Sequence, residues 1–296
     1  MKLNNKITES SNIKSKDIDK KNIYEILNIF NNEDETVVKA VRDSLEGICD
    51  IINITIKSLN NNGRLFYIGA GTSGRLGVLD AVECVPTFSI SDTLVQGIIA
   101  GGKDAMFKSI ENAEDKIDEI SSIIKNNSIS SKDIIIGISC SGEAPFVLEF
   151  LKQSNNCGAA TALITFNNIE ELTYIDHILK VFVGPEIISG STRMKSGTAT
   201  KMILNMISTT TMIKLNKTYG NFMVDLKIMN DKLLSRGLFI IESLTNLDTE
   251  KAKELLHESK NKVKNAIIMH ELGVTYLESE KLLKKNNGSL RSLIEK

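Results

Sequence analysis

Apolar residues recur at three- and four-residue intervals over the first part of the chain. Val37, Val41 and Leu45, for example, fall on one face of a helix, because an α-helix has about 3.6 residues per turn. The pattern predicts two amphipathic helices, one over 17–30 and one over 33–59. An Asn-Asn-Gly sequence then interrupts the pattern, as turn-forming residues do between secondary-structure elements.

Short apolar runs follow, and several of them end in turns of small residues. The runs lie at 64–68, 134–138, 160–165 and 178–183. Helical patterns separate them, around 146–153 and 194–215. A nearly continuous apolar run is typical of a strand that is buried on both faces. The alternation of such strands with helices predicts an α/β fold with a doubly wound parallel sheet.

The last part of the chain has helical patterns but no strand signal. Beyond about Asn221, short helical stretches are separated by Asp248, Gly273 and a second Asn-Asn-Gly turn. We therefore expect three parts. They are N-terminal helices packed on the core (1–60), an α/β domain (61–220) and a small helical C-terminal domain (221–296).

Charge and cysteine content exclude several classes of function. The 36 basic and 37 acidic residues give a formal net charge of -1 and are mixed along the chain, so no broad positive field would attract nucleic acid. The four cysteines show no CxxC spacing, and none of the three histidines is close to one, so we expect neither a zinc site nor a disulfide framework. Residues 1–15 are polar, and no stretch reaches the roughly 18 apolar residues that span a bilayer. We expect a cytoplasmic protein without a membrane partner.

The first strand runs into a loop of the form Gly-x-Gly-x-x-Gly, at Gly69–Gly74, and a helix follows the loop. This order, with Asp92 about twenty residues further on, matches the fingerprint of a dinucleotide site. The match is weak by itself, because a tight turn of purely structural origin can use the same glycines. A nicotinamide-dependent dehydrogenase and a structural turn both stay open at this point.

A second loop of small polar residues, Ser139–Gly142, follows the strand over 134–138. Open α/β sheets bind ligands at the carboxyl ends of their strands. Serine hydroxyls and the N–H groups at a helix start suit a phosphate group, because the helix dipole and the unsatisfied donors favour negative charge. The alternative is that the serines only cap helices. Two such loops together favour a small phosphorylated ligand.

A third polar loop, 184–198, leads from the last strand into a long helix. It is dense in hydroxyl groups and has Arg193 and Lys195 in one turn, which helix capping alone does not require. Either basic side chain would suit a ligand carboxylate or a charge at a subunit interface, and the two interpretations have equal weight.

Five short motifs lie along the chain in order. They are Ile7-Thr-Glu-Ser-Ser-Asn12, Gly69-Ala-Gly-Thr-Ser-Gly-Arg-Leu-Gly77, Asp80-Ala-Val-Glu-Cys-Val-Pro86, Glu111-Asn-Ala-Glu-Asp115 and Gly190-Ser-Thr-Arg-Met-Lys-Ser-Gly-Thr198. In this order they resemble the motifs of the N-acetylmuramic acid 6-phosphate etherases, whose core is a sugar isomerase domain shared with the glucokinase regulatory protein. The resemblance covers almost the whole chain and implies the sugar isomerase fold.

The resemblance implies a lyase that cleaves the D-lactyl ether of N-acetylmuramic acid 6-phosphate. The products are N-acetylglucosamine 6-phosphate and D-lactate, formed by elimination and addition of water in amino sugar catabolism and peptidoglycan recycling. The family's catalytic glutamates fall on Glu83, as proton donor to the leaving group, and Glu114, as the base. From the residues alone, each would pass for a surface glutamate. The reaction has no redox change, so we expect no nicotinamide and no metal. The resemblance also implies a homodimer with the site near the subunit boundary.

We expect the sugar phosphate to bind through the first two loops and, more weakly, the third. The expected contacts are Gly71, Thr72, Ser73, Ser139, Ser141, Gly142 and Ser191. In one place the chain departs from the family, because Glu143-Ala144 stands where Arg-Thr usually follows the Ser-Gly of the second loop. Loss of one charge-assisted hydrogen bond costs on the order of 1–3 kcal/mol, which would weaken substrate binding.

Two other functions remain as alternatives. A non-catalytic regulator would bind a sugar phosphate through the same loops, but the intact pair of glutamates argues against it. A sugar-phosphate isomerase often uses a histidine to open the sugar ring. The three histidines, His177, His257 and His270, all lie outside the motifs.

Overall fold

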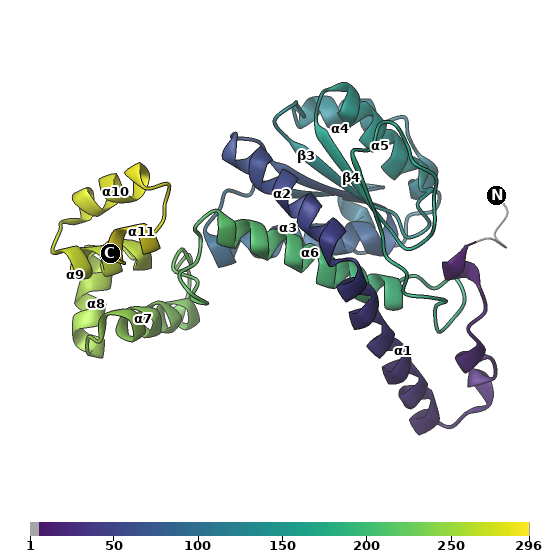
Figure 1. Ribbon diagram of the computed structural model, residues 1–296, viewed down its shortest axis with the longest axis horizontal. Coiled ribbons are helices and arrows are strands. Elements are labelled where there is room, and N and C mark those ends of the chain that lie inside the picture. The colour runs from purple at the N-terminus through teal and green to yellow at the C-terminus, as the bar shows by residue number, and fades with distance from the viewer. Residues whose placement is uncertain (1–5, 296) are drawn as a thin grey trace. The chain divides into compact units, whose positions relative to one another are not determined.

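The computed structural model describes residues 6–295 and contains a five-stranded sheet whose strands are all parallel (Figure 1). The strands are β1 (Leu65–Gly69), β2 (Val95–Ile99), β3 (Ile134–Ile138), β4 (Ala160–Thr165) and β5 (His177–Lys180). Their order in the sheet is β2-β1-β3-β4-β5, so the winding direction of the chain reverses between β1 and β3. The prediction of a doubly wound parallel sheet is confirmed.

The edge strand β2 was not predicted from the sequence. Gln96 and Gly97 interrupt its apolar run, and its three middle residues are only partly buried. An edge strand is less enclosed than a central one, so its sequence is less continuously apolar. By contrast, β1 and β3 are buried at every residue.

Helices cover both faces of the sheet (Figure 1). One face carries α4 (Ile120–Asn126) and α5 (Pro145–Asn156), and the other carries α2 (Leu45–Asn60), α3 (Gly71–Phe88) and α6 (Lys195–Lys214). Successive side chains of a strand point to opposite faces. Phe66 and Ile68 accordingly pack in the core cluster that includes Phe150 of α5. Tyr67, between them, faces α3, where a Cβ added to Gly77 would lie 2.9 Å from the Cβ of Tyr67.

The N-terminal helices begin and end at residues other than those predicted. Helix α1 (Ile23–Asp43) starts at a capping box formed by Asn22 and Glu25. It continues through residues 31 and 32, the two asparagines between the two predicted helices, where a break was expected. The break lies at Ser44 instead, before α2. Between residue 6 and α1, the chain forms three short 3-10 helices, at Ile7–Glu9, Ile13–Ser15 and Ile18–Lys20.

The chain divides into two compact units. The first contains residues 1–82 and 92–208, and the second contains 83–91 and 209–296. Beyond α6, the described residues of the second unit form five further helices, and the expected helical C-terminal region is confirmed. They are α7 (Asp231–Thr245), α8 (Thr249–Glu258), α9 (Val263–Leu272), α10 (Tyr276–Lys285) and α11 (Arg291–Ile294). The division into three parts, 1–60, 61–220 and 221–296, stays a prediction.

The helices of the second unit enclose a hydrophobic core of their own. Ile240, Leu256 and Ile267 lie in it at 2% exposure or less. The ammonium group of Lys264, also buried, lies 2.8 Å from the carboxylate of Asp225. Over residues 6–295, no helix is both long enough and apolar enough to cross a membrane.

Candidate active site

A cavity of about 250 Å³ lies where the loops after β1 and β3 meet. These strands are neighbours, and the helices that follow them lie on opposite faces of the sheet, so the two loops separate and leave a crevice. Its lining comes from the N-terminal segment, the first two loops, the segment around 114 and the third loop. The lining residues are Glu9, Ala70, Gly71, Thr72, Ser73, Glu114, Ile138, Ser139, Cys140, Ser141, Ala144, Gly190 and Thr192.

The glycines of the first loop serve the turn itself. A Cβ on Gly69 would lie 2.6 Å from the backbone nitrogen of Gly74, and a Cβ on Gly74 would lie 2.6 Å from the carbonyl oxygen of Gly69. Gly71 has a φ of +52°, which other residues rarely adopt. The Gly-x-Gly-x-x-Gly pattern is therefore explained by close backbone packing, without a dinucleotide.

The first loop ends at the N-terminus of α3, an 18-residue helix. Gly71, Thr72 and Ser73 form its first turn and line the cavity. The N–H groups of a first turn have no carbonyl partner within the helix, and the helix dipole makes this end positive. This wall of the cavity is suited to an anion.

The second loop presents hydroxyl groups whose oxygens already accept hydrogen bonds. The backbone N–H of Ala144 donates to Ser139 Oγ at 3.2 Å, and the N–H of Glu143 donates to Ser141 Oγ at 3.1 Å. The two hydroxyl oxygens lie 3.3 Å apart. Since at most one hydroxyl hydrogen is used between them, the other is available to donate to a ligand. A pair of hydroxyls arranged in this way favours an acceptor such as a phosphoryl oxygen.

Two of the expected ligand contacts are not among the residues that line the cavity. Gly142 has a φ of +75°, and a Cβ there would lie 2.5 Å from the side chain of Ile169, so its role in the turn is structural. Ser191 lies in a turn in which its N–H donates to the carbonyl of Ile188. Its neighbours Gly190 and Thr192 line the cavity instead.

Glu114 lies in a short 3-10 helix, Ala113–Asp115, and lines this cavity as well as an adjoining one of about 360 Å³. Arg75, in α3, holds the preceding segment, because its guanidinium donates to the carbonyls of Met106 and Lys108. Partial burial by the cavity walls raises the pKa of the Glu114 carboxyl, and the charge of Asp115 raises it further. Glu114 thus combines a position on the cavity with a carboxyl of increased basicity.

Glu83 lies in the part of α3 that belongs to the second unit, and it is exposed. Its backbone carbonyl accepts a hydrogen bond from the Thr87 hydroxyl at 2.7 Å. Pro86 lies in the same helix and has no N–H, so the backbone carbonyl of Val82, four residues earlier, has no hydrogen-bond donor from the helix backbone at that position.

Three lining residues that bear a polar side chain were not predicted as contacts: Glu9, Cys140 and Thr192. Glu9 and Thr192 lie within motifs that were noted in the sequence, but nothing in the spacing showed that these motifs meet the first two loops. Cys140 Sγ lies 3.6 Å from Ser73 Oγ. Burial raises the pKa of this thiol to about 11 although hydrogen bonds with Ser73 and Thr192 lower it, so the thiol is uncharged near neutral pH. Cys140, in the second loop, thus contacts both the first and the third loop without adding a charge to the cavity.

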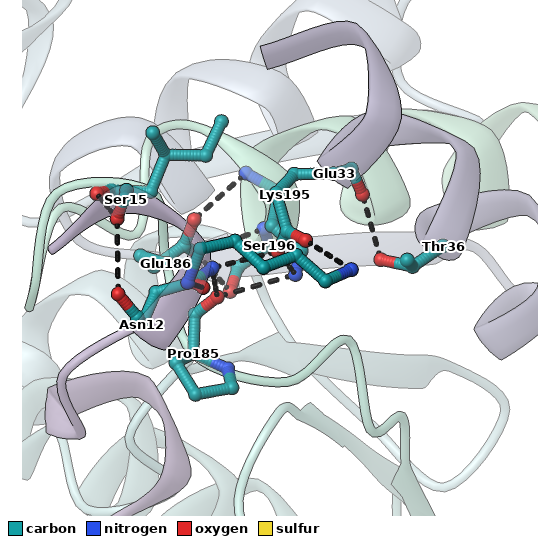
Figure 2. Close-up of polar contacts among 10 residues, drawn as sticks. Asn12, Ser15, Glu33, Thr36, Pro185, Glu186, Lys195 and Ser196 are labelled. Carbon is teal, nitrogen blue, oxygen red and sulfur yellow. Dashed lines mark hydrogen bonds and ion pairs between the residues drawn. The ribbon is translucent and has the colours of Figure 1, made fainter. Parts of the chain in front are cut away.

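Lys195 does not line the cavity. Its ammonium nitrogen lies 2.8 Å from Glu33 Oε2 and 3.2 Å from the carbonyl oxygen of Pro185, and the side chain is 2% exposed (Figure 2). Arg193, by contrast, is exposed. Lys195 is therefore occupied by a buried carboxylate of α1 and is not free to meet a ligand.

Two buried carboxylates anchor the third loop. Glu186 accepts hydrogen bonds from the N–H groups of Lys195 and Ser196 and from the Ser196 hydroxyl, and so caps α6 (Figure 2). Burial raises the pKa of Glu33, but hydrogen bonds from Lys14, Lys195 and Asn12 outweigh this effect and lower the pKa to about 2. The loop that brings Thr192 to the cavity is fixed by these contacts.

A larger cavity, of about 610 Å³, lies at the opposite edge of the sheet. Two carboxylates in its wall are already paired, since Asp133 accepts from Arg64 and Asp176 accepts from Thr161. Ligands of parallel sheets bind at the carboxyl ends of the strands, and this cavity lies at the amino ends. The smaller cavity is the better site. Over residues 6–295, no three His, Cys, Asp or Glu side chains are grouped as metal ligands.

Comparisons with known proteins agree over nearly the whole chain. The family model of the N-terminal SIS domain of glucokinase regulatory protein matches residues 47–155, and the model of that protein's C-terminal lid domain matches 220–272. An N-acetylmuramic acid 6-phosphate etherase of Staphylococcus epidermidis is 44% identical over 99% of both chains. Etherases of Clostridium acetobutylicum and Bacillus licheniformis are each 46% identical over 97% of this chain, and the matches cover 96% and 95% of their own lengths.

Proposed function

Because this chain belongs to the N-acetylmuramic acid 6-phosphate etherase family, we propose that it cleaves the D-lactyl ether of N-acetylmuramic acid 6-phosphate. The products are N-acetylglucosamine 6-phosphate and D-lactate, and the enzyme is a carbon–oxygen lyase of amino sugar catabolism and cell-wall recycling. The observation that carries this proposal is the 44% identity over 99% of both chains.

The phosphoryl group binds in the cavity between the first two loops. This is supported by the N-terminus of α3 on one side and the hydroxyls of Ser139 and Ser141 on the other, which together offer donors and a positive potential. The adjoining cavity shares Gly71 and Glu114 with the first. Together they fall within the range of about 300–1,000 Å³ that is typical of small-molecule sites.

Glu114 acts as the base. The open-chain aldehyde of the sugar acidifies the proton on carbon 2, and Glu114 removes this proton. The carbon 3–oxygen bond then breaks, a carbon 2–carbon 3 double bond forms, and water adds to carbon 3. The raised pKa of the Glu114 carboxyl supports this role, because a carboxylate whose pKa lies nearer to neutrality is a stronger base.

Glu83 acts as the acid that protonates the departing lactate oxygen. Its place in the Asp80–Pro86 motif supports this assignment. A Glu83→Gln variant keeps the shape of the side chain but has no acidic proton, so it should bind the substrate and release lactate at least a hundredfold more slowly, by the usual range of about 10²–10⁴ for general acid–base groups. Wild-type turnover in this variant would remove Glu83 from the mechanism.

The enzyme is a homodimer with the site near the subunit boundary. Exposed apolar side chains at the start of α1 support this: Ile23, Tyr24 and Leu27 are 78%, 74% and 60% exposed. Such a group of apolar residues commonly marks an interface. The cytoplasm is the proposed location, because a sugar phosphate carries a charge that does not cross a bilayer unaided.

Incubation with the substrate in ¹⁸O-labelled water tests the proposed reaction. Addition of water to carbon 3 puts one ¹⁸O on the sugar product and leaves the D-lactate unlabelled, which mass spectrometry distinguishes. Label in the lactate would show attack on the lactyl carbon and contradict elimination. Absence of D-lactate would contradict the etherase activity itself.

A further inference from the structure

A carboxylate stands beside the proposed phosphoryl site. Glu143 directly follows the Ser139–Gly142 loop, and its N–H donates to Ser141 Oγ at 3.1 Å. Its side chain is 44% exposed. A negative charge in this place repels a phosphoryl dianion. The chain needs a means of reducing this repulsion if the loop is to bind phosphate.

Lys6 provides a cation at this point. Its ammonium nitrogen lies 2.6 Å from Glu143 Oε2 and 3.2 Å from the carbonyl oxygen of Ser141. The Lys6 side chain is only 9% exposed, so its partners are fixed and its charge is poorly screened by solvent. One ammonium group therefore neutralises Glu143 and holds the backbone of the hydroxyl loop.

The segment that carries Lys6 is anchored independently of this ion pair. The side chain of Asn167 donates to Thr8 Oγ1 at 2.9 Å and to the carbonyl of Cys140 at 2.8 Å. The N–H of Gly190 donates to the carbonyl of Thr8 at 3.0 Å. These bonds tie the N-terminal segment to the second and third loops, and they place Lys6 two residues from a fixed point.

The charge of Lys6 also reaches the cavity. Lys6 lowers the pKa of the Glu114 carboxyl, against the larger effects of burial and Asp115. The ammonium group is thus close enough to act on a charged group that lines the site. Lys6 itself is not among the lining residues, so its effect on a ligand passes through the loop and through its field.

We propose that Lys6 is a positioning residue for phosphoryl binding, which cancels the charge of Glu143 and fixes the Ser139–Gly142 loop for the substrate's phosphoryl group. The inference rests on the proposed function, because it assumes that the phosphoryl group binds at this loop. It assigns to the N-terminal segment of this chain the positive charge that the second loop lacks.

The binding of N-acetylglucosamine 6-phosphate and of inorganic phosphate, measured by calorimetry, tests the proposal. Lys6→Gln leaves Glu143 without a counter-ion, and we expect both ligands to bind about tenfold more weakly, equivalent to about 1.4 kcal/mol. KM for the substrate should rise by a similar factor, with a much smaller change in kcat. Lys20→Gln is the matched control, since Lys20 lies on the same segment, is 74% exposed and pairs with the exposed Asp17. It should bind both ligands as the wild type does.

A double variant separates the charge effect from a purely structural one. Lys6→Gln/Glu143→Gln removes both charges, and we expect its affinity to return to within about threefold of the wild type. Lys6→Arg should retain affinity. The proposal is overturned if Lys6→Gln binds both ligands as the wild type does, or if the double variant is no better than the single one.

Failure of the Lys6 proposal can be distinguished from failure of the proposed etherase function by comparing phosphate binding with lactate release. Wild-type protein that releases D-lactate while Lys6→Gln keeps its KM would refute this inference alone. Wild-type protein that binds the two phosphates with the expected variant pattern, but releases no lactate, would refute the etherase activity and leave Lys6 in its role. Wild-type protein that binds neither phosphate would refute the inference.

Discussion

The first unit contains two groups of ionisable side chains that differ in how fully their charges are compensated. Around Glu33, the carboxylate accepts from Lys14, Lys195 and Asn12. Glu114 shares its cavity with loop hydroxyls, the Cys140 thiol and Glu9. Burial raises the pKa of its carboxyl, the charge of Asp115 raises it further, and the charge of Lys6 only partly offsets these effects. The two carboxyl groups therefore have pKa values shifted in opposite directions.

This difference in pKa distinguishes a carboxylate with a structural role from one that is suited to catalysis. A buried carboxylate with three donors stays ionised and cannot exchange protons near neutral pH, so it is suited to fixing α1 and the third loop. A partly desolvated carboxyl without a dedicated cation can take up and release a proton, so it is suited to catalysis. Lys195 and Glu114 both lie in strongly marked motifs, and only their surroundings tell these roles apart.

The largest expected effect is on stability. Glu33→Gln leaves the buried ammonium of Lys195 without a counter-ion, and removal of one partner from a buried pair costs about 3–5 kcal/mol. Urea unfolding should show this loss. Glu35→Gln, on an exposed position of the same helix, should change the free energy of unfolding by less than about 0.5 kcal/mol. Equal stability of the two variants would contradict the architectural role of Glu33.

Acid should weaken the same network. The pKa of Glu33 is about 2 in the folded protein and 4.5 in its unperturbed form, so its stabilising effect is present above pH 4.5 and is lost as the pH falls toward 2. The loss amounts to on the order of 3 kcal/mol. Urea unfolding as a function of pH should show a smaller acid loss in Glu33→Gln than in the wild type. Parallel profiles would contradict the lowered pKa.

A smaller gain in binding is expected from Ala144→Thr. Ala144 lines the cavity and stands at the N-cap of α5, where no side chain caps the helix. A threonine hydroxyl there would face the phosphoryl group or cap the helix, and each is worth about 1 kcal/mol. We expect up to about tenfold tighter binding of N-acetylglucosamine 6-phosphate. Ala144→Val has the same shape without the hydroxyl and should show no gain. A gain in both variants would point to packing.

The smallest expected effect is a shift in the pH profile. The base must be ionised, so kcat/KM falls as the pH drops through the raised pKa of Glu114. The charge of Asp115 contributes to that increase, so Asp115→Asn should move the acidic limb to lower pH. A limb that stays in place, or moves up, would show that Glu114 is not the group that titrates.

Much of the fold could be predicted because buried parallel strands have continuous apolar sequences. The strand at 160–165 is confirmed to the residue. The strand expected at 178–183 is shorter, since β5 ends at Lys180, and the helix break near Asn31 was wrong because the capping box at Asn22 and the turn at Ser44 set the ends of α1. The low helix propensity of two asparagines has a smaller effect on helix stability than the packing of the apolar face along a long helix.

The site could be predicted only in part. The first two loops follow strands, so their meeting at one edge of the sheet follows from the topology. Contacts between distant segments, such as Thr8 with Gly190 or Lys6 with Glu143, have no periodic signal. Lys195 is a second example. A basic residue in a polar loop has the same sequence pattern whether its side chain binds a ligand or pairs with a buried carboxylate.

The most direct test of the account is the rate of D-lactate release by Glu114→Gln, compared with Glu119→Gln, an exposed glutamate nearby in the chain. We expect Glu114→Gln to keep its affinity for N-acetylglucosamine 6-phosphate and its thermal midpoint, and to lose at least about a hundredfold in kcat. Glu119→Gln should match the wild type in all three. Lactate release by Glu114→Gln at the wild-type rate would contradict the claim that this cavity, with Glu114 as its base, is where the ether bond is broken.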